Sequence, residues 1–79
     1  MENFYVYSKT GCTWCKQIKQ IMTLKKIPFV ELKLNEDFTL EDFIIKFNKT
    51  SFPQILHGEE YIGDCIDTIK YLKNNNIIT

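Results

Sequence analysis

The sequence contains no arginine. All ten basic residues are lysines, and they balance ten acidic residues to a formal net charge of zero. Arginine recognises phosphates and base edges with two parallel hydrogen bonds, and nucleic-acid binding generally needs a basic surplus. Both are missing, so we expect no nucleic-acid partner. The 79 residues include only three glycines and two prolines and show no repeat or low-complexity linker, which predicts one domain over residues 1–79.

Long apolar runs are also absent. Runs such as residues 43–45 are far shorter than a membrane span, and no basic stretch followed by an apolar one opens the chain. The three cysteines are an odd number, which cannot close a framework of disulfides as in small secreted domains. We therefore expect a cytoplasmic protein with reduced thiols and no membrane association. In that compartment, a close cysteine pair indicates redox chemistry or metal binding.

The periodicity of apolar residues predicts the first three elements. Aromatic and β-branched residues at positions 4–8 predict a strand covered on both faces. A helix should begin near Cys12 and end before Pro28, because its apolar residues recur at helical spacing; we expect Trp14, Ile18, Ile21 and Met22 to face inward. Residues 29–34 alternate as in a half-exposed strand, with Val30, Leu32 and Leu34 inward.

The second half of the chain predicts four more elements. Apolar residues at 40, 43, 44 and 47 indicate a helix with Thr39 as its N-cap. Short strands at 54–56 and 60–62 should form a hairpin through a turn at 57–58. A helix starting near Asp64, which can act as its N-cap, should turn Ile66, Ile69 and Leu72 inward. The fold class is therefore α/β, in the order β-α-β-α-β-β-α. The helix between the first two strands makes them parallel.

The Cys12-Thr-Trp-Cys15 sequence carries the chemistry. It lies where the first strand gives way to the first helix, and its spacing puts the two sulfurs one helical turn apart. Cys12 stands at the helix N-terminus, where unpaired N–H groups and the helix dipole stabilise a thiolate, with Lys9 and Lys16 nearby. Cys12 is therefore the predicted nucleophile. Cys15, inside the first turn, is the predicted resolving thiol.

Two other interpretations of the cysteine pair stay open at this point. The pair could form half of a zinc site, with His57 and Cys65 as further ligands. Structural zinc sites, however, usually contain a second closely spaced pair, which this chain lacks. Alternatively, both thiols could be buried and inert.

Three segments together resemble the glutaredoxin family. They are residues 7–15 (YSKTGCTWC), residues 50–55 (TSFPQI) and residues 61–68 (YIGDCIDT). They follow the family's order and spacing, and the resemblance covers essentially the whole chain. It implies a thioredoxin-like fold with a four-stranded mixed sheet flanked by three helices.

Two positions in the motif depart from the family's commonest pattern. Thr13 stands where many members have proline, and Trp14 replaces the usual tyrosine. A tryptophan can still shield the nucleophile and pack on a substrate, or be partly buried in the core. Thr13 leaves the loop less rigid. The few dithiol members that bind an iron–sulfur cluster also lack this proline, so a [2Fe–2S] cluster is an alternative cofactor.

The resemblance also implies where glutathione binds. Lys9 would hold its glycyl carboxylate, and the backbone of Phe52, before a cis Pro53, would pair with its cysteinyl part. The γ-glutamyl carboxylate of glutathione would meet the N-terminus of the last helix. Asp67 would meet the γ-glutamyl ammonium group. The full predicted glutathione site is Lys9, Thr13, Trp14, Ser51, Phe52, Pro53, Gly63, Asp64, Cys65, Ile66 and Asp67.

The implied function is that of a glutathione-dependent thiol–disulfide oxidoreductase acting through Cys12 and Cys15, with glutathione as reductant. Its expected partners are glutathione and disulfide-bonded or glutathionylated proteins, with ribonucleotide reductase as a family-typical client. We expect a monomer without a metal. A redoxin reduced directly by thioredoxin reductase would have the same fold and is a further alternative, as is the iron–sulfur protein.

Overall fold

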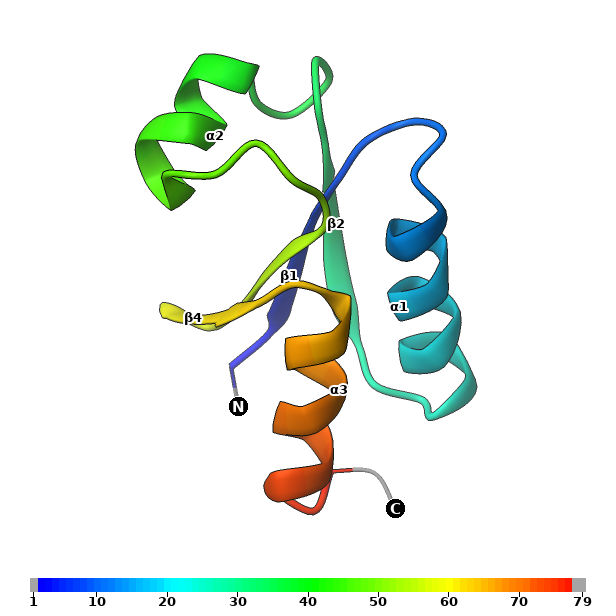
Figure 1. Ribbon diagram of the computed structural model, residues 1–79. Coiled ribbons are helices and arrows are strands. Elements are labelled where there is room, and N and C mark those ends of the chain that lie inside the picture. Colours follow the sequence, from blue (N-terminus) through cyan, green and yellow to red (C-terminus); the bar gives the residue numbers. More distant parts are fainter. Residues whose placement is uncertain (1, 78–79) are drawn as a thin grey trace.

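A computed structural model describes residues 2–77 as a four-stranded sheet with three helices (Figure 1). The elements, in chain order, are β1 (Phe4–Ser8), α1 (Thr13–Leu24), β2 (Phe29–Lys33), α2 (Leu40–Phe47), β3 (Gln54–His57), β4 (Glu60–Gly63) and α3 (Cys65–Asn74). The strands lie in the order β2-β1-β3-β4, with β1 and β2 parallel and the other two pairings antiparallel. The predicted element order and the mixed sheet are therefore confirmed.

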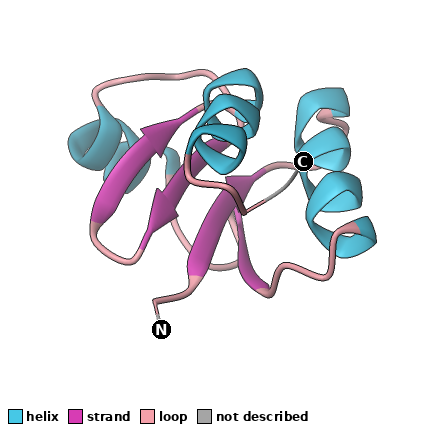
Figure 2. Cartoon of the chain, turned by 90° about the horizontal axis from the view of Figure 1, so that it is seen from below, coloured by secondary structure: helices cyan, strands magenta, loops and turns pink. Residues whose placement is uncertain are grey.

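Strand β1 lies inside the sheet and contributes side chains to both faces. Phe4 and Val6 pack into the larger core, which α1 and α3 cover, while Tyr5 and Tyr7 pack towards α2. Figure 2 shows helical segments on both sides of the sheet. The predicted strand covered on two faces is thus confirmed, and this strand leads directly into the cysteine pair.

The two cores differ in composition. The core beneath α1 and α3 is largely aliphatic, and its fully buried members include Ile18, Met22, Ile55 and Leu72. The core beneath α2 is aromatic: the ring of Phe43 lies 4.2 Å from that of Phe52 and 4.9 Å from that of Phe47. Because Phe52 lies in the loop before β3, the aromatic core also supports the segment that carries Pro53.

Several residues predicted to face inward are exposed. Trp14 and Ile66 are 55% and 48% exposed, because each lies in the first turn of its helix, beyond the edge of the core. Leu40 and Ile44 of α2 are exposed as well, and Phe43 and Phe47 alone form the buried side of that helix.

Strand β2 also does not follow the predicted alternation of buried and exposed side chains. It is an edge strand, and its Val30 is 39% exposed. On the opposite face, Glu31 is half-buried, and Ser8 and Lys19 both donate hydrogen bonds to it. The strand ends at Lys33, one residue before the predicted limit, and Leu34 forms only an isolated bridge with Phe38.

The hairpin is longer than predicted. His57 is the last residue of β3, and the turn consists of residues 58 and 59. The ring of His57 stacks on Phe4 with centroids 4.1 Å apart, and its Nδ1 lies 2.7 Å from the Tyr71 hydroxyl. These contacts place His57 in a structural role at the end of the sheet.

No helix within residues 2–77 is long and apolar enough to cross a membrane.

Candidate active site

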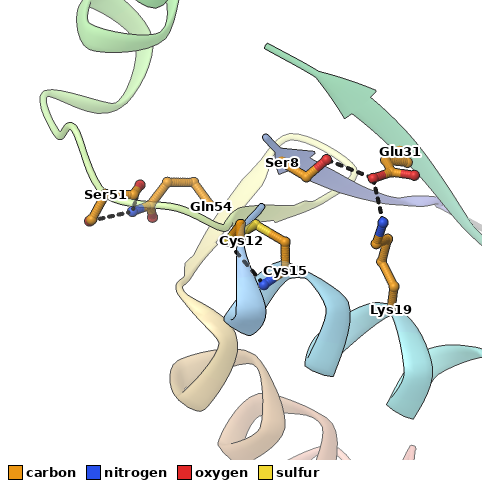
Figure 3. The surroundings of a disulfide bond; sticks show 7 residues. All are labelled: Ser8, Cys12, Cys15, Lys19, Glu31, Ser51 and Gln54. Carbon is orange, nitrogen blue, oxygen red and sulfur yellow. Dashed lines mark hydrogen bonds and ion pairs between the residues drawn. A yellow bond between two sulfur atoms is a disulfide. The ribbon is translucent and has the colours of Figure 1, made fainter. Parts of the chain in front are cut away.

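The two cysteines of the motif lie at the start of α1 and are joined by a disulfide bond (Figure 3). Cys12 is the N-cap, with an extended backbone, and its Sγ accepts a hydrogen bond of 3.1 Å from the N–H of Cys15. The Cα atoms are 5.2 Å apart. Cys12 is 8% exposed and Cys15 only 1%. The predicted contrast is therefore present: the N-capping sulfur is the outer one.

This geometry favours a thiolate on Cys12 once the disulfide is reduced. The first-turn N–H groups of a helix have no partner within the helix, and they carry the positive end of its dipole. A sulfur that already accepts one of these N–H bonds gains more from it when negatively charged. Cys12 therefore has the environment of an attacking thiol, whereas Cys15 is shielded beneath it.

A basic cavity of about 220 Å³ lies on one side of the disulfide. It is lined by both cysteines and by Lys9, Thr10, Gly11, Lys16, Lys19, Glu31 and Lys33. Four lysines surround a single carboxylate there, so the cavity adds positive potential near Cys12, as predicted for Lys9 and Lys16.

Glu31 is the acidic member of this cavity, and the sequence did not identify it. Its Oε2 accepts hydrogen bonds of 2.7 Å from both Lys19 Nζ and Ser8 Oγ. Burial acts to raise the pKa of Glu31, but these two hydrogen bonds and the nearby lysine charges outweigh it, so the pKa is lowered. Glu31 is thus ionised at neutral pH and neutralises Lys19. Nothing in the sequence indicated these contacts, because Glu31 lies on an edge strand and its partners are 23 and 12 residues away along the chain.

A groove of about 310 Å³ lies next to the motif, which contributes Trp14 to it, but neither Cys12 nor Cys15 lines it. It is lined by Trp14, Ser51, Phe52, Pro53, Asp64, Cys65 and Ile66, all of which were predicted for the glutathione site. The Phe52–Pro53 peptide bond is cis, as the resemblance implied. The exposed side chains of Trp14 and Ile66 form part of the wall of the groove and do not belong to the core.

The other four predicted residues, Lys9, Thr13, Gly63 and Asp67, do not line the groove. Lys9 lines the basic cavity, and its Nζ is 5.3 Å from the centre of the ring of Phe52, which lines the groove. Thr13 is the exposed first residue of α1. Gly63 ends β4 with φ of +130°, a conformation that favours glycine, and a Cβ there would lie only 2.7 Å from that of Asp67.

The N-terminus of α3 closes one end of the groove with a capping box. Asp64 Oδ1 accepts a hydrogen bond of 3.0 Å from the N–H of Asp67, and the Asp64 N–H donates one of 3.3 Å to Asp67 Oδ2. The predicted N-cap role of Asp64 is confirmed. In addition, two backbone donors at this helix end are already bonded to carboxylates.

Cys65 belongs both to the core and to the groove. It is 2% exposed and packs in the larger core. Burial, with a smaller contribution from the Asp64 carboxylate, raises the pKa of its thiol, so that this cysteine stays protonated at neutral pH. Within residues 2–77, no group of three or more His, Cys, Asp or Glu side chains could hold a metal ion. The zinc arrangement with His57 and Cys65 is therefore not formed.

A second hydrogen-bonded group that the sequence analysis missed lies behind the groove. Gln54, the residue after Pro53, is 1% exposed, and its side chain is bonded to Ser51 and to Tyr61. A polar residue next to the proline, at the start of a buried strand, was the available signal. Figure 3 shows Ser51 and Gln54 on the side of the disulfide opposite Glu31 and Lys19.

Comparison with known proteins agrees with this geometry. A sequence model of the glutaredoxin family matches residues 5–62. Glutaredoxin 3 of Escherichia coli K12 is 31% identical over 68 residues, which cover 85% of this chain and 82% of that protein. The hybrid peroxiredoxin hyPrx5 of Haemophilus influenzae is 31% identical over 70 residues. The match covers 89% of this chain but only 29% of the length of that protein.

A solved structure extends the likeness to the fold. The buckwheat glutaredoxin–glutathione complex superimposes with a TM-score of 0.80 at 16% identity, covering 96% of this chain and 73% of that one. The dithiol at the start of α1, the groove with its cis proline and the match over most of the chain agree. This protein therefore belongs to the glutaredoxin family, whose members are glutathione-dependent thiol–disulfide oxidoreductases.

Proposed function

We propose that this protein uses glutathione to reduce protein disulfides and glutathionyl mixed disulfides, with Cys12 as nucleophile and Cys15 as resolving thiol. The observation that carries the proposal is the position of Cys12. Its sulfur is the outer one of the pair, accepts an N–H bond at the N-terminus of α1, and lines the basic cavity.

The chemistry consists of successive thiol–disulfide exchanges. The Cys12 thiolate attacks one sulfur of a substrate disulfide, forms a mixed disulfide with it, and releases the other sulfur as a thiolate, which then takes a proton. With a protein substrate, Cys15 loses its proton and attacks Cys12, giving the Cys12–Cys15 disulfide and the reduced client. One glutathione thiolate opens that disulfide, and a second releases Cys12 and forms glutathione disulfide. The 5.2 Å between the Cα atoms suits the intramolecular step.

The groove suits a glutathionyl group with its sulfur at Cys12. In this placement the Phe52 backbone pairs with the cysteinyl part, Lys9 meets the glycyl carboxylate, and Asp67 meets the γ-glutamyl ammonium. Lys9, close to the Phe52 ring, supplies a positive charge for the glycyl carboxylate, and the N-terminus of α3 supplies the positive end of a helix dipole for the γ-glutamyl carboxylate. Ser51, Thr13, Trp14, Pro53, Gly63, Cys65 and Ile66 complete the proposed walls and surroundings.

The proposed setting is cytoplasmic, and the proposed working form is a monomer. Clients are disulfide-bonded or glutathionylated proteins, and ribonucleotide reductase is the first client to test.

The test is a coupled assay with glutathione, glutathione reductase and NADPH, using a glutathionylated peptide and a disulfide-bonded protein as substrates. The expected result is NADPH oxidation that depends on both this protein and glutathione. Oxidation that requires thioredoxin reductase and not glutathione would contradict the proposal and favour a redoxin served by that reductase.

The iron–sulfur alternative has a separate measurement. Protein purified without oxygen is expected to be colourless, monomeric and active. A brown dimer with sulfur-to-iron charge-transfer absorption, and no activity in the coupled assay, would instead identify a cluster-binding protein.

A further inference from the structure

Gln54 is a fully buried polar residue beside the groove. It is the first residue of β3 and is 1% exposed, yet its side chain does not line the groove. An amide in such a position needs hydrogen-bond partners, because an unpaired buried donor or acceptor destabilises the folded state. The identity of those partners shows what the residue can do.

One end of the Gln54 amide is bonded to Ser51, which lines the groove, and the other end to Tyr61 in β4, which leads to Asp64. Its Nε2 donates to the Ser51 carbonyl oxygen at 3.0 Å and to Ser51 Oγ at 3.2 Å. Its Oε1 accepts from the hydroxyl of Tyr61, in β4. The amide thus uses both N–H donors and its acceptor on partners from two different segments.

The first of these segments is residues 51–54. The side chain of Gln54 reaches back to Ser51 and so brackets Phe52 and Pro53, the two residues between them. The Ser51 carbonyl is held from inside the protein, which limits rotation of the Ser51–Phe52 peptide group. Phe52 supplies the backbone proposed above to pair with the cysteinyl part of glutathione.

The second segment is β4, which continues through Gly63 into the capping box of α3. The aromatic ring of Tyr61 packs 5.6 Å from that of Phe47, and its phenol points to Gln54. Burial, followed by the charges of Asp67 and Asp64, raises the pKa of Tyr61, so its hydroxyl stays a donor at every physiological pH. The bond to Gln54 therefore persists where the protein works.

We propose that Gln54 is a positioning residue for glutathione. Its amide joins the 51–53 wall of the groove to the strand that leads into the wall at Asp64, and it holds both in the arrangement that the tripeptide requires. This inference deepens the proposed function and depends on it. Binding to a preorganised groove loses less entropy, so weakening this link should lower affinity without altering the sulfur chemistry.

The test compares Gln54→Met, Tyr61→Phe and Tyr71→Phe with the wild type. Methionine matches glutamine in length and shape but forms none of the three hydrogen bonds. Tyr61→Phe removes only the hydroxyl that bonds Gln54. Tyr71→Phe is the matched control, since it removes a hydrogen-bonded phenol at the other end of the hairpin, bonded to His57 and Glu60.

Two kinetic readouts separate positioning from a general structural role. The first is the apparent KM for a glutathionylated peptide, measured together with kcat. The second is the rate constant for reaction of reduced Cys12 with an aromatic disulfide that lacks the glutathione skeleton. We expect KM to rise about five- to tenfold in Gln54→Met and about threefold in Tyr61→Phe, as lost hydrogen bonds imply. The aromatic disulfide rate and kcat should stay within about twofold, and Tyr71→Phe should match the wild type.

Three results would overturn the inference. One is an unchanged KM in both Gln54→Met and Tyr61→Phe. Another is a parallel loss of both readouts, which would show a general structural role. The third is an equal rise of KM in Tyr71→Phe. If Gln54→Met does not fold, Tyr61→Phe alone decides, because Tyr61 is 43% exposed and its ring is retained. A wild type that shows no preference for glutathionylated over other mixed disulfides would refute the proposed function itself.

Discussion

Replacing Asp64 with glycine should tighten glutathione binding. In the capping box, Asp64 Oδ1 accepts the Asp67 N–H at 3.0 Å, so this donor is already used before any ligand arrives. A γ-glutamyl carboxylate at the same helix end would compete with Asp64 for that N–H and would also be repelled by its charge. Asp64→Gly removes both effects, and glycine adopts the extended N-cap conformation without difficulty.

The expected gain follows from these two contributions. One recovered hydrogen bond in this solvent-exposed site contributes about 1 kcal/mol. A like charge about 5 Å away in a solvent-exposed site contributes roughly 1 kcal/mol, and less in salt. Together they amount to about 1–2 kcal/mol, or roughly a tenfold lower Kd or apparent KM. Asp64→Asn keeps the cap but loses the charge, so it should show only about a threefold gain, and that gain should shrink as salt is added.

The assay is titration calorimetry of glutathione with the reduced protein, supported by the KM for a glutathionylated peptide. Glu41→Gln is the matched control, because it removes a carboxylate from the first turn of α2 instead of α3. Because glycine is itself a tolerated N-cap, Asp64→Gly should lower the free energy of unfolding by only about a few tenths of a kcal/mol. Unchanged or weaker glutathione binding in Asp64→Gly would show that Asp64 does not oppose the ligand, and the reasoning would be refuted.

Four further predictions concern the dithiol and stability. Cys12→Ser should abolish thiol transfer in the coupled assay, whereas residual activity near that of the wild type would move the nucleophile to another cysteine. Cys15→Ser should retain deglutathionylation of a peptide but lose reduction of a protein disulfide; loss of both together would contradict the proposed roles. The folded-state pKa of Glu31 lies below its ordinary value of 4.5, so its carboxylate stabilises the fold above that pH, and this contribution disappears as the pH falls through the folded pKa. Glu31→Gln should therefore flatten the loss of stability on acidification in urea unfolding, and an unchanged acid dependence would argue against the link to Lys19 and Ser8. Phe43→Ala should lower the free energy of unfolding by about 3–5 kcal/mol in the same experiment, since this ring is 1% exposed and stacks on Phe52; a loss under 1 kcal/mol would contradict the packing.

The sequence alone determined those features that depend on neighbouring residues. The Cys12–Cys15 spacing, the N-caps at Thr39 and Asp64, and the element order could all be predicted, because helix periodicity and capping act within a few residues. The resemblance to the family added the groove and its cis proline, neither of which periodicity reveals.

Tertiary structure alone decided which side chains face the site. Trp14 and Ile66 fit the apolar stripe of their helices, yet both are exposed, because no other element covers the first turns beside the groove. Predicting this would have required knowing where the core ends.

The polar contacts follow the same rule. Glu31 meets Ser8 and Lys19 across 23 and 12 residues of sequence, and Gln54 meets Tyr61 across 7 residues and a hairpin. Hydrogen bonds between distant side chains depend on strand order and on register to within one residue, since a shift of one position turns a side chain to the opposite face of the sheet. Only the packed sheet fixes that register, and with it the surroundings of the dithiol.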